Sequence, residues 1–251
     1  MPAKNKTTTA RLKTRNGVKK HAVVSRDAWI TARKALLAKE KAFTKARDGI
    51  NQQRRNLPWV RVEKEYVFDG PDGGKTLAGL FDGKSQLIVY HFMFGPGWKE
   101  GCKHCSFWAD TFNGLNFHLR LRDTNMVAIS RAPWKELKPF KKRMGWGFKW
   151  LSSADTDFNF DYHVSFTPGQ LTKKKAFYNY KFGNPDITEL VGISAFYKDD
   201  KGTVYHTYST YSRGVDLLNA AYNYIDLTAK GRDENTESTQ DWVRYHDEKV
   251  D

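Results

Sequence analysis

The chain has 251 residues, of which 39% are hydrophobic and 14% aromatic, so composition excludes a wholly disordered protein and allows one globular domain with extensions. No apolar run approaches the roughly 20 residues of a membrane-spanning helix, and the N-terminus lacks the apolar core of a secretory signal, so we expect a cytoplasmic protein. The 42 Lys and Arg residues exceed the 28 Asp and Glu residues, and the net charge of +14 raises the question of an anionic partner.

Two basic segments could bind nucleic acid. Residues 1–24 carry much of the positive charge with almost no apolar company, which is typical of a disordered tail. Residues 173–181 interleave Lys with aromatic side chains, a pattern that can stack on single-stranded nucleic acid. No nucleic-acid fold motif accompanies either segment, so we expect a solvated tail and an exposed loop rather than a nucleic-acid interface.

The first predicted element is a helix that begins at Ser25 and runs to about Arg47, with Lys and Arg on its outer face. Gly, Asn and Pro residues within 49–58 end it, so residues 25–57 form an N-terminal helix and linker. The apolar residues that recur at helical spacing are Trp29, Ala32, Leu36 and Phe43.

A main domain is predicted over residues 58–228. The continuous apolar run at 86–94 predicts a central strand buried on both faces. A Gly-Pro-Gly turn ends this strand, two cysteines follow, and a helix begins. Residues 126–130 predict a second buried strand, and Pro133 opens the helix after it.

The last predicted elements are a hairpin over residues 191–197 and 203–208 and a closing helix over 214–224. Residues 165–190 form an insertion before this hairpin, and residues 229–251 form a C-terminal extension. The order predicts an α/β protein with a mixed sheet and flanking helices. This is the layout of a thioredoxin-like fold with an N-terminal helical extension. The pattern alone would fit other α/β folds, so the placement of the two cysteines decides the choice.

Cys102 and Cys105 are the two cysteines of the chain, separated by Lys103 and His104. A pair this close does not suit the disulfide framework of a secreted protein. At the start of a helix, free N–H groups and the helix dipole stabilise a thiolate, so we predict Cys102 as the nucleophile and Cys105 as the resolving thiol. Lys103 and His104 add cations beside the sulfur, which predicts a lowered thiol pKa and a relatively oxidising pair.

Three other interpretations of the cysteines stay open. They could be small buried hydrophobes, or a dithiol that the fold retains without turnover. They could also be half of a zinc site completed by His91 and His118. No second C-x-x-C or H-x₃₋₅-H spacing supplies the other ligands, so we predict no metal and no cofactor, with Cys102, Cys105, His91 and His118 as the alternative set.

Three further residues are candidates for supporting roles. His91, in the strand that leads to the cysteines, could accept the proton of the resolving thiol. Trp98 could line a hydrophobic substrate cleft together with other tryptophans, although core packing is the expected role of most of them. Arg131 follows the second strand and could stabilise a thiolate or an anionic substrate, or be an ordinary ion-pair residue.

Seven stretches carry a resemblance to a known family: residues 86–94, 100–102, 105–110, 130–133, 142–146, 157–161 and 206–211. Together they resemble the thioredoxin-like family described as domain of unknown function 899 (DUF899). The resemblance covers most of the chain after Ser25 and implies a thioredoxin-like fold.

A wider similarity, over residues 126–164, is to peroxiredoxins of the AhpC/TSA type. It implies a thioredoxin-like fold of the peroxiredoxin type and suggests peroxide reduction. The sequence departs from that type, because no Thr stands between Pro96 and Cys102 to hydrogen-bond a peroxide. It also departs from thioredoxins, which place a cis-proline opposite the dithiol where this chain has Val191. The absent proline argues against ordinary binding of protein substrates.

These observations predict a thiol-disulfide oxidoreductase or a thiol peroxidase-like protein that acts through the dithiol. Its substrate would be a peroxide, a thiol or a disulfide-bearing molecule, and its electron donor is not specified by the sequence. The alternative is a non-catalytic binding module that holds a metal or a protein partner through the same cysteines. The sequence leaves open whether the chain forms a homodimer.

Overall fold

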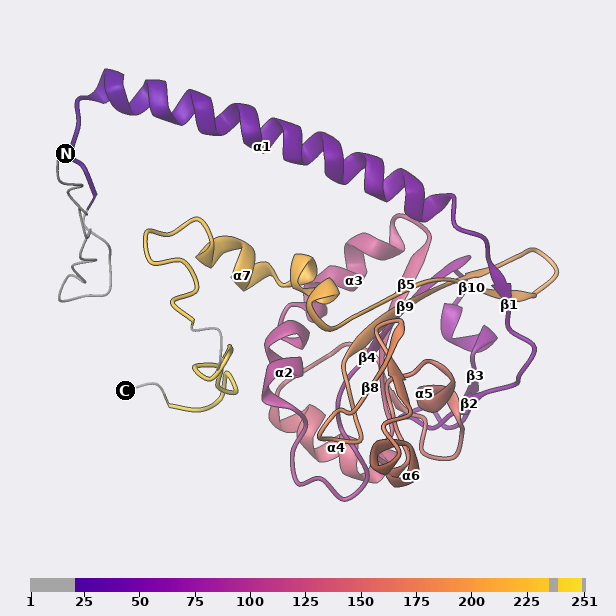
Figure 1. Ribbon diagram of the computed structural model, residues 1–251. Helices are drawn as coiled ribbons and strands as arrows, with labels where there is room; N and C mark the ends of the chain where they lie inside the picture. The colour runs from indigo at the N-terminus through magenta and orange to yellow at the C-terminus, as the bar shows by residue number, and fades with distance from the viewer. Residues whose placement is uncertain (1–20, 235–238, 250–251) are drawn as a thin grey trace, which may run out of the picture. The chain divides into compact units, whose positions relative to one another are not determined.

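The computed structural model describes residues 21–234 and 239–249 (Figure 1). Most of the predicted disordered tail therefore lies outside the described residues. The described chain divides into two compact units. One holds the residues up to Asn56 together with Ala221–Thr239, and the other holds Leu57–Ala220 together with the described residues from Gln240 onward.

The helices of the first unit are α1 (Arg26–Arg55) and most of α7 (Ala220–Ile225). Ser25 caps α1 as predicted, and its hydroxyl accepts a hydrogen bond from the Ala28 N–H at 3.3 Å. The predicted end near Arg47 is wrong, because α1 continues through Gly49 and stops only shortly before Pro58. A lone glycine costs a helix only about 1 kcal/mol relative to alanine, whereas a proline disfavours helical backbone in the residue before it.

The second unit is built on a six-stranded mixed sheet. Its strands are β1 (Val60–Arg61), β4 (Gln86–His91), β5 (Thr124–Ser130), β6 (Trp150–Ser152), β9 (Gly192–Lys198) and β10 (Val204–Tyr211). The strand order is β1-β10-β9-β4-β5-β6. The central strand β4 pairs parallel with β5 and antiparallel with β9. Both predicted buried strands and the predicted hairpin are confirmed.

The connection between β4 and β5 carries the cysteines. Parallel neighbours need a crossover, and here α2 (Lys103–Ala109) and α3 (Phe112–Arg120) provide it, where the sequence predicted one helix. Helix α4 (Trp134–Arg143) then leads from β5 to β6. The order β10-β9-β4-β5, with β9 antiparallel, is that of a thioredoxin-like fold. The predicted mixed α/β fold is confirmed.

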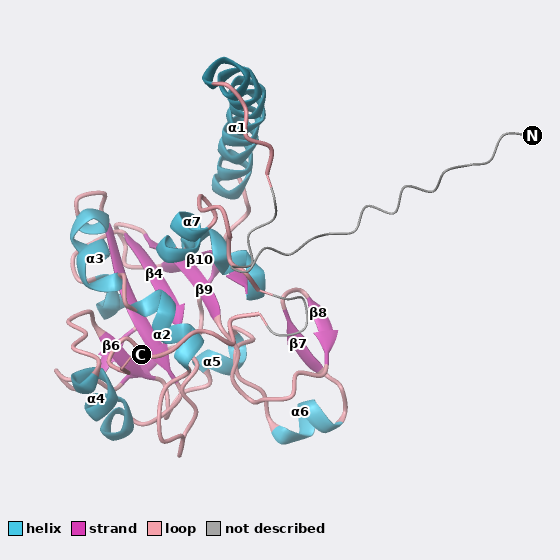
Figure 2. Ribbon diagram, turned by 90° about the vertical axis from the view of Figure 1, so that its left-hand side faces the viewer, coloured by secondary structure: helices cyan, strands magenta, loops and turns pink. Residues whose placement is uncertain are grey.

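The smaller elements are β2 (Val67–Phe68), β3 (Lys75–Thr76), η1 (Ala78–Phe81), α5 (Phe158–Asp161), α6 (Pro168–Thr172), β7 (Ala176–Tyr178), β8 (Lys181–Gly183) and η2 (Ser212–Leu218). The predicted insertion at 165–190 holds α6 and the β7–β8 hairpin, which is a sheet of its own (Figure 2). Every helix in the described ranges is too short or too polar to cross a lipid bilayer.

Alternate residues of β4 face opposite sides of the sheet, as the pleat requires. Leu87 and Val89 belong to a core shared with Phe158 of α5 and with η1. Tyr90 points to the other side, where its ring meets Phe112 of α3 at 5.0 Å between centroids. Figure 1 shows α2 and α4 on one side of the sheet and α5 on the other. This alternation decides which side chains of β4 can approach the cysteines.

Candidate functional site

The backbone between β4 and α2 places the dithiol. Cys102 is the residue just before α2, and its N–H donates to the Met93 carbonyl at 3.0 Å, which holds the segment against the end of β4. Gly101 must be a glycine here, because an added Cβ would lie 2.7 Å from Phe92 Cε1 and 2.9 Å from Phe140 Cε1. The cysteines are thus seated on an aromatic core that leaves them little room to shift.

The two thiols have opposite environments. Cys102 is half-buried and Cys105 is buried, and both are free cysteines. A hydrogen bond from the Cys105 thiol lowers the pKa of Cys102 well below its usual value, and a hydrogen bond with His104 lowers it further, against the opposing effect of burial. Burial raises the pKa of Cys105 well above its usual value, and the Cys102 sulfur adds to that rise. The pair therefore favours one thiolate, on Cys102, held by a neutral thiol.

The residues between the cysteines lie at the start of α2. Lys103 is its first residue and is half-buried. His104 follows, and its Nε2 is buried without a hydrogen-bond partner among the described residues. Cys102, Lys103, His104 and Cys105 thus occupy the N-cap and first turn of α2.

Three tyrosines that the sequence did not single out surround the dithiol. The Tyr90 hydroxyl donates to the Cys105 carbonyl at 3.5 Å, and the pKa of Tyr90 is raised by burial and by the nearby Cys105. The Tyr245 hydroxyl donates to the Gly101 carbonyl at 2.5 Å. Only Tyr90 had a local signal, since it lies in the predicted strand. The third tyrosine, Tyr178, and Tyr245 come from segments predicted as an insertion and an extension.

Val191 and Tyr178 are joined beside the site. The Tyr178 hydroxyl donates to the Val191 carbonyl at 2.7 Å and accepts from the Ser212 N–H at 2.8 Å. Burial raises the pKa of Tyr178, and Cys105 contributes to the rise, which places this hydroxyl near the Cys105 thiol. The insertion thus ties Val191, just before β9, to the start of η2.

His91 does not face the dithiol. Its ring stacks on Phe158 at 5.6 Å, and its Nε2 lies 2.8 Å from the Ser194 hydroxyl, both on the face of the sheet opposite to Tyr90. Burial lowers the pKa of His91 to about 3, so the ring is neutral. This geometry corrects the expectation that His91 accepts the proton of Cys105, because adjacent strand residues point to opposite faces.

The alternative zinc set is not brought together either. His91 lies across the sheet from the cysteines, and His118 is exposed on α3, with its ring against Phe117. Within the described ranges, no group of three or more His, Cys, Asp or Glu side chains could hold a metal ion. The geometry leaves Cys102 and Cys105 as a dithiol.

The chain matches the model of a family described as "Bacterial protein of unknown function (DUF899)" over residues 18–249. The chain belongs to this family. The predicted family is therefore confirmed. Among curated proteins, none matches the chain.

Several solved structures are similar to this chain. A peroxidoxin BcpB from Mycobacterium tuberculosis is 15% identical, with 66% of this chain and 96% of that chain covered and a TM-score of 0.43. Peroxiredoxin Q from Xanthomonas campestris is 14% identical over 65% and 91% of the two chains, with a TM-score of 0.43. A hypothetical protein from Sinorhizobium meliloti 1021 is 16% identical over 72% and 88%, with a TM-score of 0.38.

Arg131 and Trp98 have partners other than the two cysteines. The Arg131 guanidinium contacts Glu189 Oε1 at 2.7 Å, and the buried Glu189 also accepts from Ser165 at 2.5 Å. Burial nevertheless raises the pKa of Glu189. Trp98 is half-buried against Gly95, where an added Cβ would meet its Nε1 at 2.9 Å and Glu189 Cγ at 3.2 Å. Arg131 is thus an ion-pair residue that fastens the insertion to the end of β5.

The tryptophans divide between core and edge. Three of those near the site are buried, whereas Trp98 and Trp134 are half-buried. The expectation that most of them pack in the core fits this arrangement. The buried ones are Trp108, Trp146 and Trp150.

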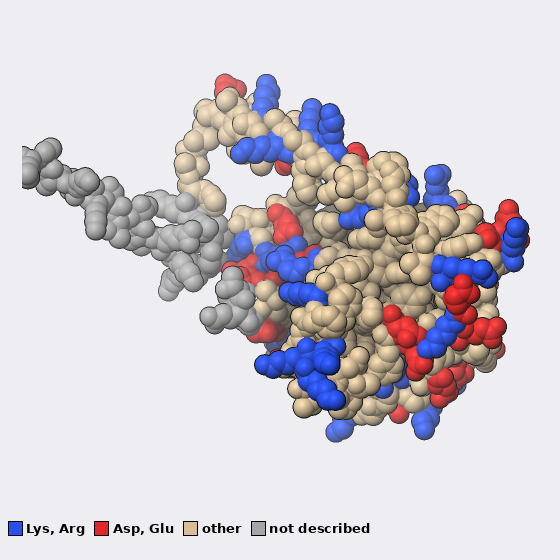
Figure 3. All heavy atoms as spheres, turned by 45° about the vertical axis from the view of Figure 1, so that its right-hand side comes forward, with Lys and Arg blue, Asp and Glu red and all other residues tan. Residues whose placement is uncertain are grey.

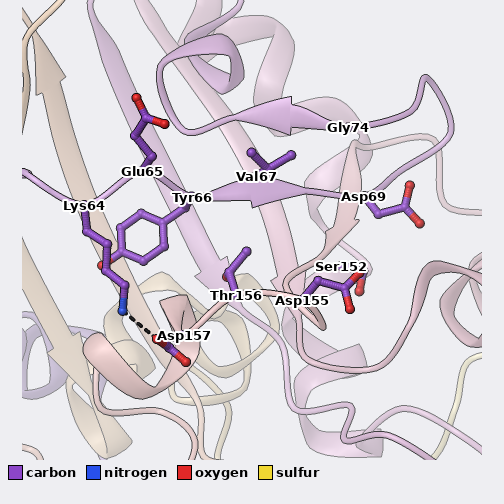
Figure 4. A pocket seen from close by; sticks show the side chains of 10 residues that line it. All are labelled: Lys64, Glu65, Tyr66, Val67, Asp69, Gly74, Ser152, Asp155, Thr156 and Asp157. Atoms are coloured by element: carbon purple, nitrogen blue, oxygen red, sulfur yellow. Dashed lines mark hydrogen bonds and ion pairs between the residues drawn. The ribbon is translucent and has the colours of Figure 1, made fainter.

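Two hollows lie away from the cysteines. One, of about 360 Å³, runs along β2 past the end of β6 and is rimmed by charged side chains such as Lys64 and Asp157 (Figure 4). The other, of about 400 Å³, is lined by parts of residues 61–66, 76–78 and 201–204. Neither is lined by Cys102 or Cys105.

The basic side chains do not form one continuous track on the face that Figure 3 shows. Among the described residues there, Lys and Arg gather in several separate groups with Asp and Glu among them. A protein that follows a phosphate backbone needs a continuous basic groove. This face does not favour the nucleic-acid alternative.

Proposed function

We propose that this protein is a dithiol redox enzyme that reduces a peroxide or a disulfide through Cys102 and Cys105. One observation carries the proposal: the pKa of Cys102 is lowered by a hydrogen bond from Cys105, while the pKa of Cys105 is raised by burial. At neutral pH this pairing supplies a thiolate nucleophile and holds a second thiol beside it.

The reaction follows from this arrangement. The Cys102 thiolate attacks the substrate, so that an S–O or S–S bond forms as the O–O or S–S bond breaks, and the leaving oxygen or sulfur takes a proton. Cys105 then loses its proton and attacks the Cys102 sulfur, which releases water or a second thiol. The dithiol gives up two electrons and becomes a disulfide. A thiol reductant, by the same exchange in reverse, restores it.

Neighbouring groups assist particular steps. His104, hydrogen-bonded to Cys102, supports the thiolate and is placed to supply the proton to the leaving group. Tyr90 hydrogen-bonds at Cys105 and partly offsets the rise in the pKa of that thiol, which helps it to ionise for the resolving step. We place this chemistry in the cytoplasm, where thiol reductants keep such a dithiol reduced.

The test is the pH dependence of alkylation of Cys102 by iodoacetamide, followed by mass spectrometry. We expect the rate to rise to half of its maximum well below the pH at which a free cysteine does. In a Cys105→Ser variant the midpoint should move to higher pH, because the thiol whose hydrogen bond lowers the pKa of Cys102 has been replaced. A midpoint at or above that of a free thiol in the unaltered protein would contradict the proposal.

The binding-module alternative predicts a different result. A protein that holds zinc through the same cysteines would retain stoichiometric metal after purification and dialysis, and its cysteines would resist alkylation until a chelator is added.

A further inference from the structure

Residues 240–249, which we name the C-terminal strap, lie against the dithiol segment. Within the second unit, Val243 is 1% exposed and the Trp242 ring meets Phe107 of α2 at 5.3 Å. His246 Nδ1 lies 2.7 Å from Asp110 Oδ1 at the end of α2. The strap thus packs against α2 and the residue that ends it.

Tyr245 brings the strap to the nucleophile. Its hydroxyl bonds to the carbonyl of Gly101, the residue before Cys102, and its ring packs on Phe140 of α4 at 5.6 Å. Cys102 is one of the charges that raise the pKa of Tyr245, which places the two side chains near each other. The strap therefore borders Cys102 on the side of α2 and α4.

Arg143 holds the strap at that side. Its guanidinium contacts both oxygens of Asp247, at 2.7 and 3.1 Å, and also pairs with Glu100, two residues before Cys102. It lies over the Tyr245 ring at 5.0 Å from the centroid. The side chains of Arg143 and Asp247 are 36% and 30% exposed, so solvent screens the pair and weakens its hold on the strap.

We infer that the strap restricts the dithiol to small electrophiles, a hydroperoxide or a low-molecular-weight disulfide, and keeps polypeptide disulfides from Cys102. This inference rests on the proposed function. A polypeptide must lay several residues of backbone beside an attacking thiolate, whereas a small molecule needs only a path to the sulfur. Tyr245 and the Arg143 ion pairs occupy surface that such a backbone would need, and they are specificity-determining residues that do not touch the reacting bond.

The experiment compares two sizes of probe on the full chain. Reduced protein is oxidised by 2-hydroxyethyl disulfide and, separately, by insulin, whose chains carry disulfides. The variant Arg143→Gln removes the ion pairs, and Arg122→Gln, an exposed arginine on the turn before β5, is the matched control. We expect Arg143→Gln to raise the insulin rate by about three- to fivefold and to change the small-disulfide rate by less than about twofold, since loss of a solvent-screened ion pair loosens the strap and opens only the polypeptide path.

A second variant guards against a general loss of structure. Tyr245→Phe keeps the ring on Phe140 but removes the bond to Gly101, and it should shift the insulin-to-small-probe ratio in the same direction by a smaller factor. A merely structural role would lower both rates together. Equal changes for the two probes, or an unaltered protein that already reduces insulin as fast as the small disulfide, would overturn the inference.

A size comparison that needs no redox activity separates this inference from the proposed function. Cys102 is alkylated by N-ethylmaleimide and by the same maleimide group carried on a long polyethylene glycol chain. We expect the polymer reagent to lag in the unaltered protein and to catch up in Arg143→Gln. If the polymer reagent behaves in this way while neither disulfide is reduced, the strap covers the site but the proposed function is wrong. The assignment of a small disulfide or hydroperoxide as substrate is then wrong as well.

Discussion

The two faces of β4 place neighbouring residues in opposite chemical settings. Tyr90 turns to α2 and hydrogen-bonds at Cys105, whereas His91 turns away and joins a buried chain of hydroxyls through Ser194. On the first face, hydrogen bonds aimed at the Cys102 sulfur outweigh burial and favour its charged form. On the second, burial acts on His91 without a counter-charge and favours its neutral form. Burial alone therefore does not decide which form a group takes, because hydrogen-bond donors that face it can outweigh burial, as they do at Cys102.

The opposite face has its own polar network. The hydroxyls of Ser194 and Ser209 lie 2.8 Å apart, and His206 Nε2 lies 2.7 Å from Ser209. Burial also lowers the pKa of His206. His91 and His206 thus lie on either side of two hydrogen-bonded serines, and this chain of hydrogen bonds links β4, β9 and β10.

Removing the nucleophile should have the largest effect. Cys102→Ser should lower the rate of oxidation by 2-hydroxyethyl disulfide or hydrogen peroxide by at least about 10³-fold, because a serine hydroxyl is not ionised at neutral pH. His91→Gln, on the other face, should leave the rate within about twofold. Stopped-flow measurement of the thiols lost gives both numbers. A similar loss in both variants would erase the distinction between the two faces.

Packing around the dithiol gives the next effect. Gly101→Ala should lower the free energy of unfolding by about 1–3 kcal/mol, because the new methyl group meets Phe92 and Phe140 at less than 3.0 Å. Gly114→Ala in α3 is the control, since an added Cβ there meets nothing within 4 Å and alanine favours a helix by up to about 1 kcal/mol. Urea unfolding of both variants is the measurement. Equal effects would mean that the dithiol segment is not tightly packed.

The buried histidine should make stability depend on pH. Unfolded, His91 has an ordinary pKa of about 6.5, and folded its pKa is lowered to about 3. Between these values the unfolded state binds the extra proton, so stability falls as pH falls, by up to about 1.4 kcal/mol per pH unit.

The variant His91→Gln isolates this contribution, because His206 and the carboxylates remain in place. We expect the loss of stability between about pH 6 and pH 5 to be smaller in the variant than in the unaltered protein. Urea unfolding at the two pH values measures the difference. Parallel pH profiles would show that His91 is protonated in the folded chain, which contradicts its buried, neutral setting.

The smallest expected effect is on the resolving step. Tyr90→Phe removes the hydroxyl that lowers the pKa of Cys105, so that thiol should ionise less readily. Closure of the disulfide after Cys102 has reacted should slow by a factor of about 2 to 5, in line with a single neutral hydrogen bond. Rapid-quench alkylation and mass spectrometry resolve this step from the first. If the initial attack slows instead, Tyr90 acts on Cys102.

Much of the fold followed from local patterns. The apolar run of β4 was predictable because burial on both faces requires apolar residues throughout a strand, and the hairpin of β9 and β10 was predictable from two strand-like runs on either side of a polar, Gly-containing turn. The dithiol was predictable because two cysteines three residues apart fit few functions other than redox chemistry or metal binding. The end of α1 was misplaced because the weak penalty of Gly49 does not overcome the helical preference of its neighbours.

The sequence by itself determined the order of strands and helices along the chain, the family, and the position of Cys102 and Cys105 at the start of a helix, since these depend on residues close together in the chain. Only the tertiary structure decided that Tyr90 and not His91 faces the thiols, and that Tyr178 and Tyr245 arrive from distant segments. Packing between whole elements decides which side chains of a strand face a given helix. It also decides which segments distant in the sequence come into contact. Local sequence patterns do not encode such packing.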